Sequence, residues 1–233
     1  MKMFKVSVLS VILGLGYIHA QAQSEKKQFS LQKGQVLDVL FINTRAGVED
    51  LQKEYFQTVF PLASKLGYHR LPGFPISNVP LQGNYHPEFL ALAYWDDLDS
   101  RSSAMATIEK EVPDFHDRRK AIWTSFNITY FELQEDVSFE IDEHKYYVVS
   151  AYWGEDKGAF RQFQKDWLKG CKEAGGQTQL VLTNGESPYL YYHNPDFLAI
   201  TAWDNQEAFE AFNERNLEMG HKVAQRVNEF HVQ

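Results

Sequence analysis

The chain has 233 residues, of which 31 are Asp or Glu and 23 are Lys or Arg, so its formal net charge at pH 7 is -8. An acidic chain whose basic residues are scattered lacks the surface that binds a phosphate backbone, which excludes a nucleic-acid partner. The single cysteine, Cys171, excludes an intramolecular disulfide, so the fold must depend on its core, to which 15% aromatic residues contribute.

The first 22 residues have the pattern of a signal peptide. Lys2 and Lys5 precede an apolar run over residues 6–15, and Ala20 and Ala22 form the small-x-small pattern that a signal peptidase recognises. This run is shorter than the roughly 20 apolar residues that span a bilayer, and no later stretch is long and apolar enough to do so. We therefore expect cleavage after Ala22 and a mature protein, without a membrane span, that is periplasmic or secreted.

Residues 23–133 predict one β-α-β-β-α-β unit. Apolar strands are expected over residues 36–42, 89–95 and 128–133, with a poorly defined strand near residues 70–76. The first helix is expected over about residues 48–66 and ends at Gly67. It carries a buried stripe at the four, four, three spacing of one helix face, namely Tyr55, Val59, Ala63 and Leu66. A second helix begins in the acidic segment 96–99.

Residues 134–144 are acidic and predict a solvated linker, and residues 145–233 then repeat the same order of elements. Strands are expected near residues 146–152, 179–183, 197–203 and 228–232. The helical stripe of this second unit consists of Phe163, Trp167, Cys171 and Ala174. Cys171 lies where the first unit has Ala63, which favours a small buried hydrophobic residue over a nucleophile.

The two units are related by a fixed offset. Segments 86–96 and 194–204 agree at six of eleven positions, and the offset between them is 108 residues. A unit of this kind is a four-stranded sheet with helices on one face, and its other face stays apolar until a second sheet covers it. The predicted fold class is therefore α+β, with two ferredoxin-like βαββαβ repeats that form an intramolecular pseudo-dimeric α/β barrel. Both a monomer and a homodimer are compatible with this prediction.

A family resemblance rests on the end of the second unit. The segment Ala202-Trp-Asp-Asn-Gln-Glu-Ala-Phe-Glu-Ala-Phe212, followed by His221-Lys222, resembles the dimeric α/β-barrel superfamily. It is most similar to antibiotic-biosynthesis monooxygenases and the related haem-degrading monooxygenases. The first unit has Trp95-Asp96 and then Asp114-Phe-His116-Asp-Arg-Arg119 at the corresponding places. The resemblance implies, in each half, an apolar pocket between the sheet and the second helix that admits a small planar or aromatic molecule.

The resemblance also implies candidate site residues. In haem-degrading members an Asn on the first strand, a Trp on the second helix and an iron-ligating His act together. The first half supplies the Asn and the His as Asn43 and His116, but Ala104 occupies the Trp position. The second half supplies the His as His221, but Phe212 occupies the Trp position and Ala151 the Asn position. Neither set is complete.

The candidate catalytic residues are therefore His116, His221 and Asn43, the alternatives being a helix histidine near solvent and an asparagine that forms a turn. Candidate substrate-binding residues are Phe212, Trp153 and Tyr94, which otherwise fill the layer between sheet and helices.

Two functions remain open at this point. One is a monooxygenase-like enzyme that acts on a small aromatic or haem-like substrate, with haem as the cofactor that the resemblance implies. The other is a non-catalytic protein that binds a small hydrophobic ligand outside the cytoplasm. The sequence contains no glycine-rich phosphate loop and no His-Glu-x-x-His segment, so neither a nucleotide cofactor nor a zinc site is expected.

Overall fold

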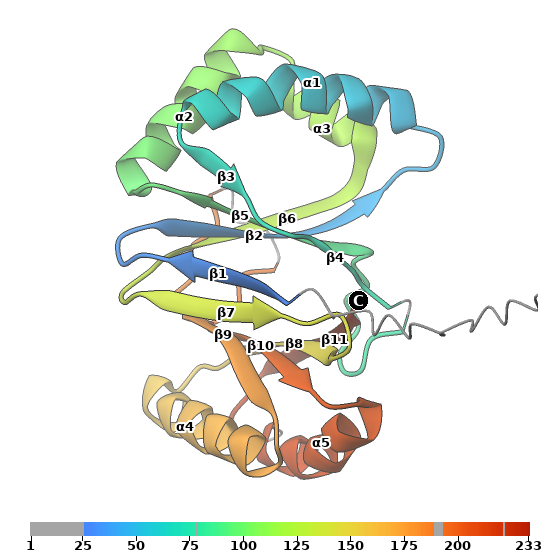
Figure 1. Cartoon of the computed structure of the whole chain (residues 1–233), viewed down its shortest axis with the longest axis vertical. Helices are drawn as coiled ribbons and strands as arrows, with labels where there is room; N and C mark the ends of the chain where they lie inside the picture. The colour runs from blue at the N-terminus through green and yellow to red at the C-terminus, as the bar shows by residue number, and fades with distance from the viewer. Residues whose placement is uncertain (1–25, 78, 189–192, 221) are drawn as a thin grey trace, which may run out of the picture.

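The computed structural model describes residues 26–77, 79–188, 193–220 and 222–233, which form four layers in the order helices, sheet, sheet, helices (Figure 1). Residues 1–22, the expected signal peptide, lie outside the described residues. The fold is α+β, and every strand pair in its sheets is antiparallel.

The first half contains one sheet and three helices. The sheet has the order β3-β5-β2-β6, with β4 also paired to β5. Its strands are β2 (Val36–Thr44), β3 (Tyr68–Arg70), β4 (Phe74–Pro75), β5 (Phe89–Trp95) and β6 (Trp123–Glu132). Its helices are α1 (Glu49–Lys65), α2 (Leu98–Glu111) and α3 (Phe115–Ile122).

The second half contains a four-stranded sheet of order β11-β8-β10-β9 and two helices. The strands are β8 (Tyr146–Trp153), β9 (Gln177–Thr183), β10 (Phe197–Trp203) and β11 (Arg226–Val232). The helices are α4 (Lys157–Glu173) and α5 (Gln206–Gly220). In both halves the first helix ends at a glycine with positive φ, 92° at Gly67 and 90° at Gly175, a conformation that costs glycine little and stops the helix.

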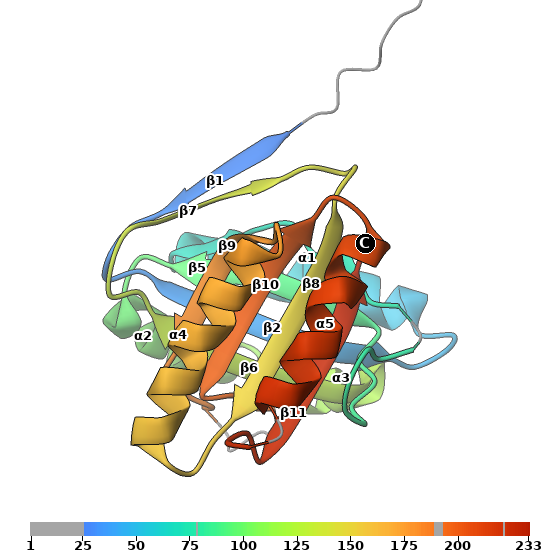
Figure 2. The same ribbon diagram turned by 90° about the horizontal axis from the view of Figure 1, so that it is seen from below.

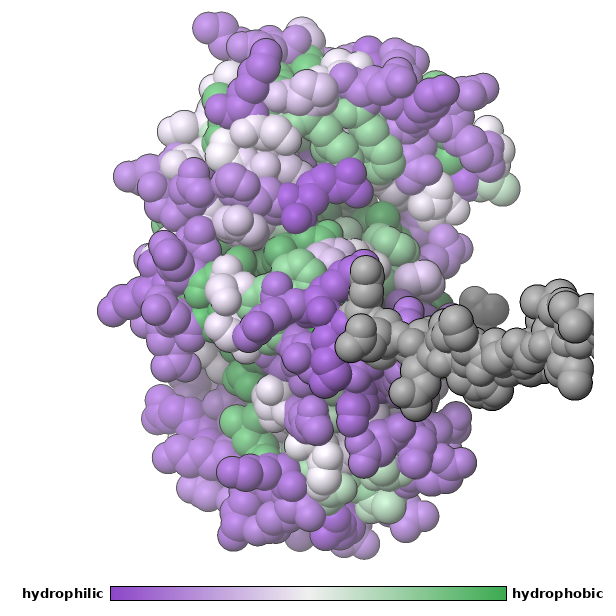
Figure 3. All heavy atoms as spheres, viewed as in Figure 1, coloured by the Kyte–Doolittle hydropathy of each residue, from purple (hydrophilic) through white to green (hydrophobic). Residues whose placement is uncertain are grey.

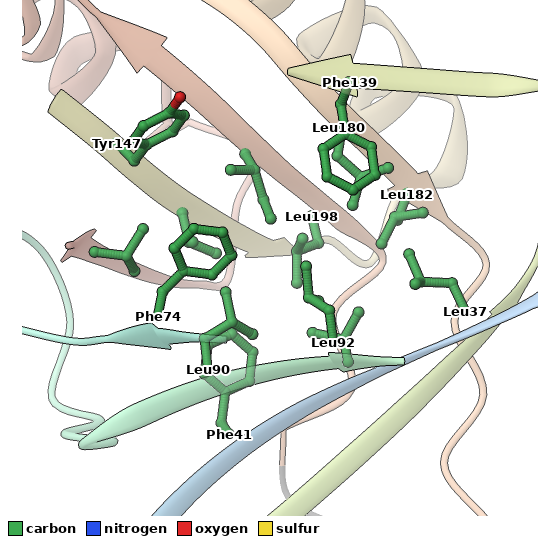
Figure 4. Packing of buried hydrophobic residues seen from close by; sticks show 14 of the residues in the cluster. Leu37, Phe41, Phe74, Leu90, Leu92, Phe139, Tyr147, Leu180, Leu182 and Leu198 are labelled. Atoms are coloured by element: carbon green, nitrogen blue, oxygen red, sulfur yellow. The ribbon is translucent and has the colours of Figure 1, made fainter. Parts of the chain in front are cut away.

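The two sheets face each other across one shared core. Side chains from both sheets point toward one another in Figure 4, among them Phe41 and Leu90 of the first sheet and Leu180 and Leu198 of the second. Isolated bridges also join the sheets at their edges, between Ile76 and Val232 and between Tyr130 and Glu186. Strands β5 and β10 are apolar on both faces because one face meets this core and the other meets helices.

A separate two-stranded ribbon lies beside the two sheets. It pairs β1 (Lys27–Leu31) with β7 (Val137–Ile141), and Figure 2 shows it extending along one side of the molecule. Phe29 and Phe139 stack across the ribbon with ring centroids 5.1 Å apart, and Phe139 is buried in the shared core. The segment expected as a solvated linker thus contains a strand with an inward-facing aromatic residue.

The outer faces of the helices are hydrophilic, whereas hydrophobic residues show between helices and sheets on the face drawn in Figure 3. Within the described part of the chain, no helix has the length and apolar character needed to cross a membrane.

Candidate functional site

A cavity of about 510 Å³ lies between the first sheet and its helices. This volume is within the roughly 300–1,000 Å³ of typical ligand pockets. Most of its wall is apolar and aromatic. The aromatic lining residues are Tyr55, Phe56, Phe60, Tyr68, Phe89, Trp95, Phe115, Trp123 and Phe126.

Strand alternation decides which side chains reach the cavity. Along β2, Asp38, Leu40 and Ile42 line it, whereas Leu37 and Phe41 face the core between the sheets. Successive side chains of a strand point to opposite faces, so a shift of one residue would reverse both surfaces.

Asp38 is the buried carboxylate of the cavity. Its Oδ1 accepts a hydrogen bond from Arg101 Nε at 2.8 Å and its Oδ2 accepts one from Trp95 Nε1, also at 2.8 Å. Burial raises the pKa of Asp38, and the charge of Arg101 opposes that rise. Both oxygens are therefore engaged, and the charge is matched by one cation.

Arg119 and Tyr55 form a second polar group in the cavity wall. Arg119 Nε donates to the Tyr55 hydroxyl at 3.0 Å. The Arg119 guanidinium lies 3.9 Å from the ring centroid of Phe115 and 4.5 Å from that of Phe126. Burial raises the pKa of Tyr55, so its hydroxyl stays protonated at neutral pH.

The corresponding layer of the second half is filled with aromatic side chains. Trp167 of α4 and Phe212 of α5 are buried and meet edge to face, with centroids 5.5 Å apart. Trp167 Nε1 also donates to the Tyr152 hydroxyl at 3.1 Å. Residue 59 of α1 is valine, whereas residue 167, which is 108 residues later, is tryptophan. A hollow of about 770 Å³ does occur in this half, but it lies between α4 and α5.

Two of the predicted catalytic residues, His116 and Asn43, lie away from the cavity wall. The His116 side chain is 43% exposed, and its Nε2 lies 3.0 Å from Glu109 Oε1. Asn43 follows Phe41 and Ile42 on β2 and so has the parity of the core face, and its Nδ2 donates to the His86 carbonyl at 2.7 Å. His221 lies outside the described residues.

The predicted substrate-binding residues also lie elsewhere. Tyr94 packs against the shared core and stacks on His69, with centroids 4.6 Å apart. Trp153 contacts the ring of His193, and Phe212 belongs to the filled layer described above. These three aromatic residues are therefore not brought together by the fold.

Asp38, Arg101 and Arg119 were not among the site residues predicted from the sequence. Asp38 had a visible signal, since it is the single charged residue of β2 and its neighbours from Val36 to Ile42 are all apolar. Arg119 had none beyond its place in the Asp114–Arg119 segment.

Comparison with known proteins supports the fold. No protein-family model and no curated protein matches the chain. The crystal structure of an anthrone oxidase-like protein is 14% identical, covers 88% of this chain and 94% of its own, and gives a TM-score of 0.50. The fold resembles that of the dimeric α/β-barrel superfamily. The resemblance predicted from the sequence is thereby confirmed at the level of fold.

Two further structures are less similar. A chlorite dismutase from Candidatus Nitrospira defluvii is 8% identical over 87% of this chain and 92% of its own, with a TM-score of 0.48. A haem-binding protein from Thermus thermophilus is 6% identical over 88% and 93%, with a TM-score of 0.43. At these identities and TM-scores, neither structure indicates an activity for this chain.

The cavity residues do not fit a haem held by an imidazole or thiolate. None of the described residues that line the cavity is histidine or cysteine. The lining tyrosines Tyr55 and Tyr68 have pKa values raised by burial, which opposes the phenolate form that would ligate iron. Among the described residues, no group of three His, Cys, Asp or Glu side chains is placed to hold a metal ion.

Proposed function

We propose that the cavity of the first half binds a small, flat aromatic molecule and that the protein is a monooxygenase-like enzyme acting on it. The observation that carries this proposal is a cavity of about 510 Å³ with an aromatic lining in one half, beside a filled layer in the other. Aromatic walls exclude water and stack on planar ligands, and the few polar groups among them fix the ligand's orientation.

The name of the anthrone oxidase-like neighbour supports oxygen chemistry on a ring system. When molecular oxygen converts an activated ring CH2 into a carbonyl, the carbon gives up four electrons and the oxygen molecule takes up all four. One oxygen atom enters the product and the other leaves as water. Because the substrate itself supplies the electrons, such a reaction needs neither an external reductant nor haem. It is therefore compatible with a cavity whose described lining offers no imidazole or thiolate to ligate haem.

A non-catalytic binding protein remains the second candidate, and one observation favours it. Asp38, the buried carboxylate of the cavity, already accepts a hydrogen bond at each oxygen, so it is poorly placed to act as a general base. Oxygen uptake in the presence of a bound ligand separates the two candidates.

The test uses the mature chain and a panel of anthrones, naphthols and flavonoids. Trp95 and Trp123 line the cavity, so quenching of tryptophan fluorescence reports binding, and an oxygen electrode reports turnover. We expect at least one member of the panel to bind and to consume one molecule of oxygen per molecule of product. Binding without oxygen uptake would favour the second candidate, and no binding by any member would contradict both.

We also propose that the two halves are sequence repeats. Helices α1 and α4 begin at residues 49 and 157 and end at residues 65 and 173. Strands β5 and β10 begin at residues 89 and 197 and end at residues 95 and 203. All four differences equal the offset of 108 residues, which supports an intramolecular pseudo-dimer.

Export is part of the same proposal. The basic residues, apolar run and Ala20-Gln21-Ala22 of the first segment support removal of residues 1–22. Mass spectrometry of the protein from its native source is expected to give Gln23 as the first residue, in the periplasm or the medium. Retention of residues 1–22 would contradict this.

A further inference from the structure

Arg119 is held in one orientation by three neighbours. Its guanidinium packs against the rings of Phe115 and Phe126, and its Nε donates to the Tyr55 hydroxyl. Within the described part of the chain, its two terminal nitrogens make no hydrogen bond. The planar guanidinium that arginine uses to bind carboxylates is therefore fixed in place, and the donors of its terminal nitrogens are unused.

Asp38 is close enough to Arg119 for their charges to interact, but no charged group of the described cavity wall forms an ion pair with Arg119. Asp38 is paired with Arg101, with 2.8 Å between Oδ1 and Nε. Glu88 is exposed and accepts a hydrogen bond from the Thr44 backbone N–H, and Arg70 is exposed and lies over the ring of Phe60. Arg119 has no carboxylate within ion-pair distance among the described residues. A partly buried cation that has no directly paired anion is less well stabilised than a paired one, so a negative ligand would be favoured beside it.

Tyr55 adds a second donor beside Arg119. Its hydroxyl oxygen accepts from Arg119 Nε, so its own proton remains free to donate. No described residue accepts that proton. The Arg119 fork and the Tyr55 hydroxyl thus lie side by side in the wall of one cavity.

We infer that Arg119 and Tyr55 recognise an ionised oxygen on a flat aromatic ligand, such as an aryl carboxylate or an acidic phenol or enol. This inference rests on the proposed function, because it concerns the same cavity. It assigns Arg119 as the residue that selects ionised over neutral ligands and holds a deprotonated ring in place.

The experiment compares 2-naphthoate with 2-naphthamide, two probes of nearly the same shape that differ in charge. Binding of each is measured by tryptophan fluorescence and by calorimetry at pH 7. The parent is expected to bind the carboxylate about tenfold or more tightly than the amide, the factor that one charge-assisted hydrogen bond supplies. Arg119→Gln should bring this ratio to about one while the amide still binds, and Tyr55→Phe should lower it by a smaller factor.

Two variants complete the design. Arg119→Lys keeps the charge without the planar fork, so it should retain an intermediate preference and it covers the case in which Arg119→Gln does not fold. Arg118→Gln is the matched control, because Arg118 is the neighbouring arginine on α3 and pairs at the surface with Asp114 and Glu54. Its ratio should equal that of the parent.

The failures are distinguishable. Equal binding of both probes by the parent, or an unchanged preference in Arg119→Gln, overturns the role of Arg119 and leaves the aromatic cavity standing. If the parent binds neither probe but binds neutral rings of the larger panel, the inference about charge is again wrong. If it binds no aromatic molecule, the proposed function is wrong as well.

Discussion

Residue 59 on α1 and residue 167 on α4 explain why one half is hollow and the other is filled. Val59 is small and borders the cavity, whereas Trp167 is fully buried and contacts Phe197 and Phe212. A buried aromatic ring contributes a large apolar surface to a core, so the second half gains packing where the first half keeps space.

Val59→Trp should therefore close the cavity. We expect aromatic probes to bind more weakly by about tenfold or more, while the melting temperature stays near that of the parent, because the new ring enters existing space. Fluorescence titration and thermal unfolding measure the two effects. Gln57→Trp places the same side chain on the exposed face of the same helix and should change neither. Unaltered probe binding in Val59→Trp would mean that the ligand site lies elsewhere.

Glu229 is a buried carboxyl group of the second half that has no cationic partner among the described residues. Its Oε1 accepts hydrogen bonds from Ser150 at 2.7 Å and from Tyr152 at 3.0 Å. Burial raises its pKa, and these hydrogen bonds only partly oppose the rise. The folded protein therefore holds this proton more tightly than the unfolded chain.

The sign of the resulting pH dependence follows from linkage. The unfolded chain releases the Glu229 proton near pH 4.3, roughly the ordinary pKa of glutamate, whereas the folded protein releases it at higher pH. The contribution of Glu229 to stability is thus complete below about pH 4.3 and decreases as the pH rises toward the folded pKa. In Glu229→Gln this loss should be absent, so the variant should gain stability relative to the parent between pH 4 and 7. Urea unfolding across this range measures the difference, and parallel curves for the two proteins would contradict the expectation.

At the scale of elements, the ribbon of β1 and β7 is a structural part of the molecule. Phe139 of β7 packs with Leu180 and Ile200 at the edge of the shared core. Because the buried face of the ribbon is apolar, its pairing with β1 is stabilised by contact with the sheets and not by the ladder alone.

Phe139→Ala should lower the free energy of unfolding by about 3 kcal/mol, the lower end of the range for removing a buried phenylalanine side chain. Ser138→Ala is the control, because Ser138 is exposed on the same strand and its loss removes only a surface contact with Ser30. Denaturant unfolding compares the two variants. Equal stabilities would show that the segment is a passive connection.

The sequence predicted the elements whose pattern is strong. Strands β5 and β10 have the bounds that were expected, because each is a run of seven residues that are all apolar or aromatic except Thr201. Strands β1 and β7 were missed, because five-residue strands in which Phe29 or Phe139 stands between polar residues do not differ from a loop in composition. The start of β6 at Trp123 was expected five residues later, at Ile128, because Thr124, Ser125 and Asn127 interrupt its apolar pattern.

The site was less predictable than the fold, for two physical reasons. Alternation along β2 separates Asp38 from Asn43, but the sequence does not say which of the two faces meets the helices. The distance between Tyr55 and Arg119 depends on how α1 packs against α3, which no local pattern specifies. Val59 and Trp167 were both predicted as buried helix residues, and a pocket was expected in each half, because the sequence does not show how closely the side chains around them pack.

At the scale of the whole molecule, the shared core joins halves that are distant in sequence. It contains Leu37, Phe41 and Leu90 from the first sheet and Leu198 and Phe230 from the second. Each sheet covers the apolar face of the other, and each Å² of apolar surface removed from water stabilises the fold by about 25 cal/mol.

Residues 26–133 expressed alone should therefore not form a stable monomer. The uncovered sheet face is expected to associate with a second copy or to aggregate, because association removes this apolar surface from water. Light scattering after size-exclusion chromatography measures the outcome, with the full chain as the control. A fragment that stays monomeric and melts cooperatively would show that the two halves are independent.

The bridges that close the edge between the sheets can form only after the C-terminal strand has been synthesised. Ile76 pairs with Val232 and Gln82 with Glu229, so roughly 150 further residues must be synthesised before these pairs can form. At the usual rate of synthesis that interval is roughly 8 to 30 s. During this interval the residues of the first sheet have been synthesised but the second sheet is incomplete. The apolar face of the first sheet is therefore uncovered. The incomplete chain therefore passes through a period in which an uncovered apolar face makes it prone to aggregate.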